Sequence, residues 1–202
     1  MVCRAQTPVI LISIDTLRAD RVGARTPNIA SFGQHGTMFT AAETQIPLTL
    51  PSHTALLTST YPFRNGVEEN AGRVPQNLPT LASVLHGRGY KTAAFIGSIF
   101  LERQLGLDGG FDDYDSPFNF EAFSSLSGTM VFAGGPQSAY SVRERRPGAL
   151  VIRAATNGLR LIKGSRFSLS SICSTCISHI GWDLTTRRFS RSIKCWEGSG
   201  RR

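Results

Sequence analysis

A short apolar run that ends in a carboxylate places the first limit on how this chain can fold. The run PVILISI, residues 8–14, is rich in β-branched side chains and is followed directly by Asp15. Such a run predicts a strand buried on both faces, in the centre of a parallel sheet. Because ligands of open parallel sheets bind beyond the carboxyl ends of the strands, Asp15 lies where a functional group is expected.

Helical patterns separate this run from a second predicted strand, KTAAFIGS, at residues 91–98. One helix is predicted after Thr26, with Pro27 in its first turn and Gly36 at its end. Composition and period further predict a short strand at 38–44 and helices at 50–62 and 77–90. The apolar face of the last helix is expected at Leu78, Leu81, Val84 and Leu85. This alternation predicts an α/β fold with a largely parallel sheet and flanking helices.

Charge divides the chain into two unequal parts. Residues 1–124 hold nine Lys/Arg and eleven Asp/Glu, whereas residues 125–202 hold thirteen and three. Within the basic part, residues 125–164 combine a linker-like stretch with an amphipathic helix, RPGALVIRAATNGLRLIKG. Residues 165–202 form a Ser/Arg/Cys-rich tail with no sustained period of 2 or 3.6, so we expect no regular structure there.

Several classes of partner are disfavoured by composition. The basic tail has no recognised nucleic-acid motif and few aromatic side chains for stacking on bases, so no specific nucleic acid is predicted. No apolar run approaches the roughly 20 residues of a membrane span, and the N-terminus shows no export signal, which gives a cytoplasmic location by default. The sequence makes no prediction about oligomeric state.

The segment PLTLPSH, residues 47–53, holds the first candidates for chemistry. A hydroxyl at Thr49, just before a helix, would lie at the positive end of the helix dipole, where phosphate or sulfate binds well. A hydroxyl becomes a useful nucleophile when a metal or a base activates it. The alternative is that Thr49 and Ser52 only cap the helix, with Pro51 as an ordinary first-turn proline.

Three further candidates each have a structural alternative. Asp15 either ligates a divalent metal or caps a turn. His53 is either a functional group, which orients the nucleophile or meets the anion, or a partly buried histidine with satisfied hydrogen bonds. Asn70 either donates its amide to a non-bridging oxygen in the transition state, or is a turn residue.

Taken together, five segments resemble the N-terminal half of the sulfatase-like branch of the alkaline phosphatase superfamily. They cover about residues 8–117 and occur in the family's order: PVILISIDTLRADRVG, TPNIASFGQHGTMFTAAE, TLPSHTALLTSTYPFRNGV, LPTLASVLHGRGYKTAAFIGS and GLDGGFDDYD. The resemblance implies that residues 1–124 are the N-terminal part of a sulfatase-like catalytic domain and that 125–164 belong to the same domain. It also implies a sheet larger than this chain encodes, that is, a truncated fold.

The resemblance further implies a metal-dependent hydrolase of phosphate or sulfate esters. Sulfatases carry Cys-x-Pro-Ser-Arg at the nucleophile, where this chain has Thr49, Pro51, Ser52 and His53. The Thr-x-Pro-x-His form is similar to the nucleotide pyrophosphatase/phosphodiesterase branch, whose threonine attacks phosphorus directly. The implied catalytic residues are Thr49, His53 and Asn70, with a small-molecule phosphate or sulfate ester as substrate and phosphodiesters preferred.

The resemblance implies a divalent metal, zinc or calcium, held in part by Asp15 and Thr49. Sulfatases usually have a second acid where this chain has Thr16, and the family's downstream Asp-Pro-His and Asp-His ligands have no counterpart in the sequence. The alternative prediction is therefore a catalytically incomplete fragment. The change of composition near Gly164 suggests that the tail is translated out of frame, which the DNA beyond that codon would test.

Overall fold

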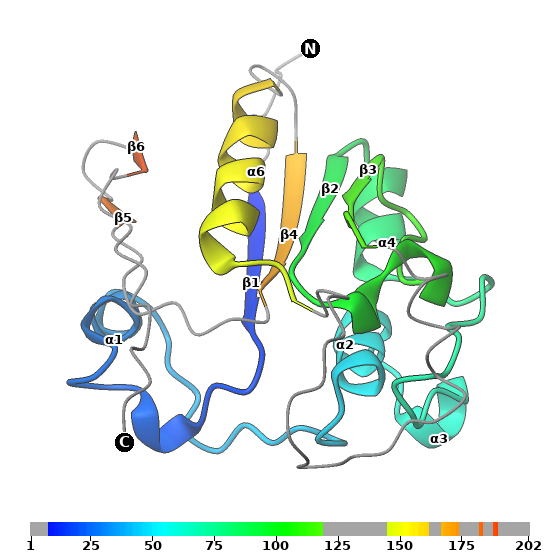
Figure 1. Cartoon of the computed structure of the whole chain (residues 1–202), viewed down its shortest axis with the longest axis horizontal. Coiled ribbons are helices and arrows are strands. Elements are labelled where there is room, and N and C mark those ends of the chain that lie inside the picture. The colour runs from blue at the N-terminus through cyan, green and yellow to red at the C-terminus, as the bar shows by residue number, and fades with distance from the viewer. Residues whose placement is uncertain (1–7, 119–144, 162–166, 174–181, 184–187, 190–202) are drawn as a thin grey trace, which may run out of the picture.

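The computed structural model describes residues 8–118, 145–161, 167–173, 182–183 and 188–189. Within these ranges four strands form a parallel sheet in the order β1-β4-β2-β3 (Figure 1). The strands of this sheet are β1 (Val9–Ile14), β2 (Lys91–Ile96), β3 (Asp113–Asp115) and β4 (Phe167–Cys173). A small antiparallel pair consists of β5 (Trp182–Asp183) and β6 (Arg188–Phe189). The predicted α/β class is confirmed.

The helices of the described ranges are short, apart from one of 14 residues. They are α1 (Pro27–Gln34), α2 (Thr49–Thr58), α3 (Pro62–Asn65), α4 (Leu81–Gly87) and α6 (Gly148–Leu161). The 3-10 turns are η1 (Ala19–Arg21), η2 (Ile99–Leu101) and η3 (Arg103–Leu105). None of the helices in these ranges combines the length and apolar character needed to cross a membrane.

The side chains of strand β2 pack against helices on both faces of the sheet, so the sheet is the middle of three layers. Its side chains alternate between the two faces because the strand has a period of two. Ala93 and Phe95 belong to a core cluster with Val151 and Ala155 of α6. Ala94 and Ile96 belong to the opposite cluster, which includes Leu50 and Leu57 of α2. The sheet therefore lies between α6 and α2, and burial of Leu50 holds the start of α2 against the protein interior.

The placement of β1 differs from the prediction. Within the described sheet β1 is an edge strand, and Ile12 remains 42% exposed. The apolar run identified a strand correctly, but a run of this kind does not determine which strands pair beside it. Residues 38–44, where a short strand was predicted, contain no strand. A run of seven residues is too short for its composition to establish a strand, because a strand also needs a neighbour to pair with.

Strand β4 lies in the segment where no regular element was expected. It pairs in parallel with β1 from Val9 to Ile14 and with β2 from Lys91 to Ile96. The expectation of an unstructured tail is therefore wrong for β4, and also for the described residues of β5 and β6, which pair with each other. Residues 174–181, 184–187 and 190–202 of the tail lie outside the described ranges. The proposed out-of-frame origin concerns the DNA and stays a prediction.

The amphipathic helix predicted within residues 125–164 is confirmed as α6. Val151, Ile152 and Ala155 are buried, whereas Arg153 is exposed. The stretch before it, residues 119–144, lies outside the described residues, so the predicted linker is not tested.

Helix α4 begins at a capping box that the sequence analysis missed. Thr80 Oγ1 accepts a hydrogen bond from Ser83 N (3.0 Å), and Ser83 Oγ accepts one from Thr80 N (2.9 Å). The predicted apolar face is partly wrong, because Leu81 and Val84 are exposed while Ala82 and Leu85 are buried. The capping box sets where the helix starts, and packing then selects the buried face of a helix with only two turns.

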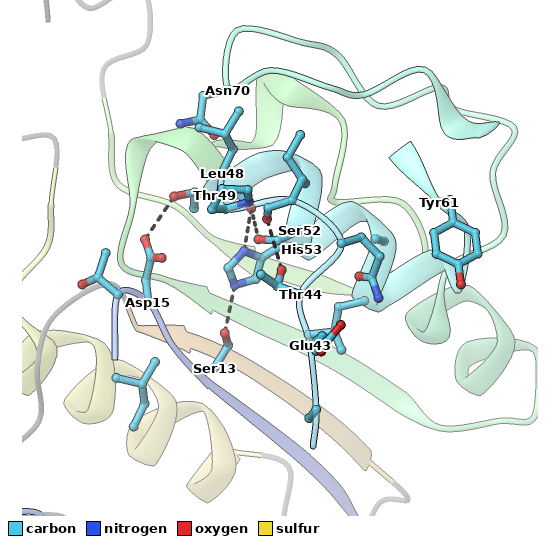
Figure 2. Close-up of a pocket in the computed structure, with 18 of the residues that line it drawn as sticks. Ser13, Asp15, Glu43, Thr44, Leu48, Thr49, Ser52, His53, Tyr61 and Asn70 are labelled. Atoms are coloured by element: carbon cyan, nitrogen blue, oxygen red, sulfur yellow. Dashed lines mark hydrogen bonds between the residues drawn. The ribbon is translucent and has the colours of Figure 1, made fainter. Parts of the chain in front are cut away.

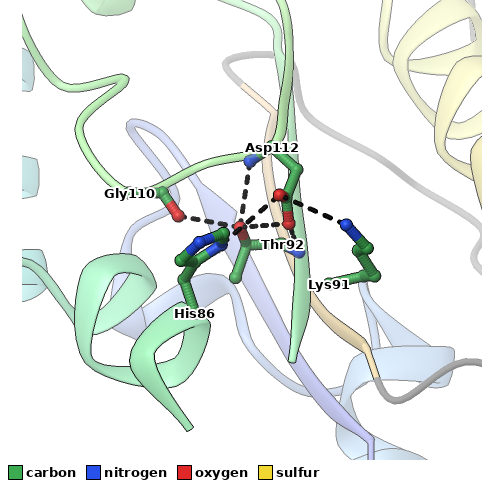
Figure 3. Close-up of polar contacts among 5 residues, drawn as sticks. All are labelled: His86, Lys91, Thr92, Gly110 and Asp112. Carbon is green, nitrogen blue, oxygen red and sulfur yellow. Dashed lines mark hydrogen bonds and ion pairs between the residues drawn. The ribbon is translucent and has the colours of Figure 1, made fainter. Parts of the chain in front are cut away.

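A polar cluster around Asp112 ties the start of β2 to the chain that precedes β3 (Figure 3). Asp112 Oδ2 accepts hydrogen bonds from Thr92 N (2.8 Å) and Thr92 Oγ1 (3.1 Å). Its Oδ1 lies 3.3 Å from His86 Nδ1 and 3.6 Å from Lys91 Nζ. Burial alone would raise the pKa of Asp112, but the Thr92 hydrogen bonds and the charges of Lys91 and His86 together hold it below its usual value.

We expect Asp112→Ala to lower the free energy of unfolding by about 1–3 kcal/mol, because Thr92 loses charge-assisted hydrogen bonds. Since the folded-state pKa is depressed, this stabilisation is complete above the unfolded-state value of 3.8 and is lost as pH falls through the folded-state pKa. Urea unfolding at several pH values measures both effects. Asp113→Ala, at the exposed neighbouring carboxylate, is the matched control, and equal losses in the two variants would contradict the assignment.

Candidate active site

The carboxyl end of β1 and the first turn of α2 meet at a pocket of about 960 Å³. The four residues singled out from the sequence, Asp15, Thr49, His53 and Asn70, all line it. Figure 2 shows Asp15 and Asn70 on either side of Thr49, with His53 beneath. The fold therefore brings together residues that are up to 55 positions apart in the chain.

Thr49 is the first residue of α2, and Leu48 is the N-cap. The Thr49 hydroxyl donates a hydrogen bond to Asp15 Oδ2 at 3.1 Å. The Ser52 hydroxyl donates to the Thr49 carbonyl oxygen, also at 3.1 Å. Neither hydroxyl caps the helix, so the capping alternative does not describe the geometry. Pro51 does lie in the first turn, as predicted.

Asn70 is tied to the start of the same helix. Its Oδ1 accepts a hydrogen bond from Leu50 N at 3.0 Å. Among the described residues, no acceptor is found for Asn70 Nδ2 or for Thr49 N, and Pro51 has no N–H to offer. The amide of Asn70 thus holds the helix start through its oxygen and keeps its nitrogen as a donor. These donors lie at the positive end of the helix dipole, which suits an anion.

His53 is 5% exposed, and both of its ring nitrogens are occupied. Nδ1 lies 2.7 Å from the Thr49 carbonyl oxygen, which can only accept, so Nδ1 carries the proton. Nε2 is then an acceptor for the Ser13 hydroxyl at 2.9 Å. Burial lowers the pKa of His53, against the opposing effects of the Thr49 carbonyl and the Asp15 charge. The ring therefore orients the Thr49 backbone and has no free donor for an anion.

Ser13 is the residue of this site that the sequence analysis missed. It lies in β1 two positions before Asp15 and thus on the same side of the strand. That spacing was the available signal, but a serine inside an apolar run carries little information without its partner. Its hydrogen bond to His53 joins β1 to the first turns of α2.

We expect His53 to stay neutral, with its proton on Nδ1, at pH values where an ordinary histidine is protonated. Its folded-state pKa is below the unfolded value of 6.5, so stability is complete above pH 6.5 and declines as pH falls below it toward the folded-state pKa. Nitrogen-15 NMR of the imidazole reports the tautomer and the titration. His53→Gln identifies the signal and should flatten this part of the pH dependence. A ring that titrates at or above 6.5 would contradict the assignment.

The described residues do not complete a metal site. Near Thr49 they offer the Asp15 carboxylate and the Thr49 hydroxyl, and no group of three His, Cys, Asp or Glu side chains occurs in the described ranges. Catalytic zinc sites usually have three protein ligands. Thr16, at the position of the family's second acid, has φ 60°, a left-handed conformation that is strained for a β-branched residue. The donor set therefore falls short of the site that the resemblance implies.

Comparison with known families decides which family this site belongs to. The family model described as sulfatase matches residues 7–130, more than half of the chain. The chain belongs to the sulfatase family. Human arylsulfatase D is 31% identical to this sulfatase-family chain over 101 residues, which cover 42% of the chain and 17% of the relative. Mouse steryl-sulfatase is 31% identical over 157 residues, covering 69% of the chain and 23% of the relative. The chain thus spans less than a quarter of the length of either relative.

Solved structures share the fold of this sulfatase-family chain. BT4656, solved with D-glucosamine-2-N,6-O-disulfate, superposes with a TM-score of 0.59 at 19% identity, covering 82% of the chain and 34% of that protein. The phosphonate monoester hydrolase of Agrobacterium radiobacter gives a TM-score of 0.58 at 20% identity, covering 83% of the chain and 41% of that protein. At such identities the likeness establishes a common fold.

Proposed function

We propose that this sulfatase-family chain forms the nucleophile side of an ester hydrolase acting on phosphate or sulfate esters, with Thr49 as the nucleophile. The observation that carries this proposal is the 3.1 Å hydrogen bond from Thr49 Oγ1 to Asp15 Oδ2 at the first turn of α2. It joins a nucleophile and an acceptor for its proton within the distance that catalysis requires. If Thr49 only capped the helix and Asp15 only capped a turn, this side-chain hydrogen bond between them would not be expected.

In the proposed reaction Thr49 Oγ1 attacks the phosphorus or sulfur atom, and its proton passes to Asp15. As the bond to Oγ1 forms, the bond to the leaving-group oxygen breaks, and the leaving alkoxide takes a proton from solvent. Asn70 Nδ2 and Thr49 N, for which the described residues provide no acceptor, donate to the non-bridging oxygens as charge builds on them. Water then hydrolyses the covalent Thr49 ester and regenerates the hydroxyl.

His53 and Ser13 serve as positioning residues in this scheme. The chain from Ser13 Oγ through the imidazole to the Thr49 carbonyl restrains the peptide that carries the nucleophile. Since catalysis is sensitive to displacements of about 1 Å, this restraint supports the alignment of Oγ1.

Both ester classes remain within the proposal. The names of the sequence relatives refer to sulfatases, and a protein of the same fold is named as a phosphonate monoester hydrolase. A threonine attacks directly and cannot be converted to formylglycine, which favours phosphodiester and related esters. Zinc or calcium, with Asp15 as one ligand, stays a prediction, and no step above depends on it.

Trapping the covalent intermediate tests the proposal. The full chain is incubated with a nitrophenyl phosphodiester, a nitrophenyl phosphonate and nitrophenyl sulfate, quenched in acid and analysed by peptide mass spectrometry. We expect a phosphoryl, phosphonyl or sulfuryl adduct on Thr49. Absence of an adduct with all three esters, or an adduct on Ser52 in place of Thr49, would overturn it.

A further inference from the structure

Helix α1 differs from the other α-helices of the described ranges, because none of its side chains is buried. A helix of eight residues is marginal in water on its own, so it normally depends on the packing of an apolar face. Ile29 and Ala30 are partly buried, and Figure 1 shows α1 at the margin of the molecule, apart from the layers that enclose β2. The described residues therefore leave α1 without the apolar contact that a helix of this length needs.

Three large apolar side chains of α1 and the segment after it remain exposed, and together they are called the α1 face. Phe32 is 65% exposed, Met38 66% and Phe39 80%. The Met38 sulfur lies 3.8 Å from the position that a Cβ atom on Gly33 would take, so Met38 lies against α1. The three side chains expose on the order of 400 Å² in total. A patch of this size is as large as the largest on typical monomers and usually marks an interaction site.

The α1 face is uncharged and is flanked by two opposite charges. Residues 26–42 contain no Asp, Glu, Lys or Arg. Arg25 lies directly before this stretch and Glu43 directly after it, and both are exposed. Neither of them forms an ion pair with another described residue. A two-fold axis through such a face brings no like charges together at its centre and places Arg25 of one copy opposite Glu43 of the other.

We propose that the α1 face binds a second copy of this chain in a two-fold symmetric dimer, with the three apolar side chains at the centre and two Arg25–Glu43 pairs at the rim. The same face serves both copies, so the association closes at the dimer. The apolar area is at the low end for specific interfaces, so a reversible dimer is expected. Because Glu43 lines the pocket, the interface adjoins the candidate active site. The inference does not depend on the proposed function.

Sedimentation velocity of the full chain over a series of concentrations tests the inference. We expect an equilibrium between monomer and dimer with no larger species. Phe39→Ser should raise the dissociation constant by about tenfold or more, because an apolar side chain at the centre of the contact is lost. Phe63→Ser is the matched control, since Phe63 is 70% exposed and belongs to α3, outside the α1 face, and it should leave the equilibrium unchanged.

An exchange of charges tests the two-fold arrangement directly. Arg25→Glu and Glu43→Arg each bring like charges together at both rim pairs, so each variant alone should dimerise about tenfold more weakly at low salt. An equimolar mixture of the two variants should recover the dimer, because one copy then carries two acidic rim residues and the other two basic ones. Recovery in the mixture also shows that both variants are folded.

Several results would overturn the inference. They are a monomer at every concentration, equal shifts in Phe39→Ser and Phe63→Ser, and a mixture of the charge variants that dimerises no better than either variant alone. Growth beyond the dimer would mean head-to-tail association and would contradict the two-fold contact. A monomer that binds neutral phosphatidylcholine vesicles, and loses this binding in Phe39→Ser, would show that the α1 face meets lipid and not a second copy.

Discussion

Replacing Thr49 by alanine should lower the rate of ester hydrolysis by about a thousandfold or more, because a covalent mechanism loses its nucleophile. Thr49→Ser retains a hydroxyl at the first position of α2, still within reach of Asp15 Oδ2, and should keep a measurable fraction of the activity. The measurement is kcat and kcat/KM with a nitrophenyl ester, together with the release of nitrophenol in the first turnover.

The matched control for this pair is Ser52→Ala. Ser52 lies in the same turn, and its hydroxyl donates to the Thr49 carbonyl oxygen and not to Asp15. We expect it to lower activity far less than Thr49→Ala. Similar losses in both alanine variants, with melting temperatures that fall in parallel, would mean that the turn matters for its structure and that Thr49 is not the nucleophile.

Asn70→Asp should lower kcat/KM by about a hundredfold to a thousandfold while leaving the fold intact, as expected for loss of one donor to a transition-state oxygen. The substitution keeps an oxygen to accept the hydrogen bond from Leu50 N, now 3.0 Å from Asn70 Oδ1. It replaces the free amide nitrogen by a negative oxygen, which repels the substrate anion. A carboxylate at a helix N-terminus is favoured by the dipole, so stability should change little.

Asn70→Ala provides the contrast, because it removes both the donor and the acceptor. We expect similar loss of activity together with a decrease of about 1 kcal/mol in the free energy of unfolding, the usual effect of losing a helix-start acceptor. Rates follow from the same nitrophenyl assay, and stabilities from urea unfolding. If Asn70→Asp kept full activity, Asn70 would be a structural residue of the turn.

The sequence alone identified Asp15 and Thr49 of the candidate site because their positions follow from local rules. Asp15 comes directly after an apolar strand, and Thr49 comes directly before the buried turns of a helix. In a parallel sheet with flanking helices, both kinds of position lie at the carboxyl edge. The alternation within β2 likewise follows from its period of two, and the amphipathic pattern of α6 from its period of 3.6.

Other features depend on contacts between distant segments. Serine is rarely informative inside a strand, and the role of Ser13 emerges only when His53 is held 2.9 Å away by the packing of α2. Leu81 and Val84 of α4 were predicted to lie on the buried apolar face of the helix, but both are exposed. The local period of apolar residues cannot show which side of a two-turn helix packs against the core. The pocket itself, whose lining includes Leu56 and Tyr61, is formed only when α2 packs beside residues 42–48.

The amino-acid sequence by itself determined the class of fold, the family and the polar residues beside Thr49, because strand and helix periods and short motifs are local properties of the chain. Tertiary structure decided that β4 lies between β1 and β2, that β1 is the edge of the described sheet, and that His53 is buried with both ring nitrogens hydrogen-bonded. Which strands pair depends on the total free energy of their backbone hydrogen bonds and of the burial of their side chains. This free energy depends on contacts between residues far apart in the sequence.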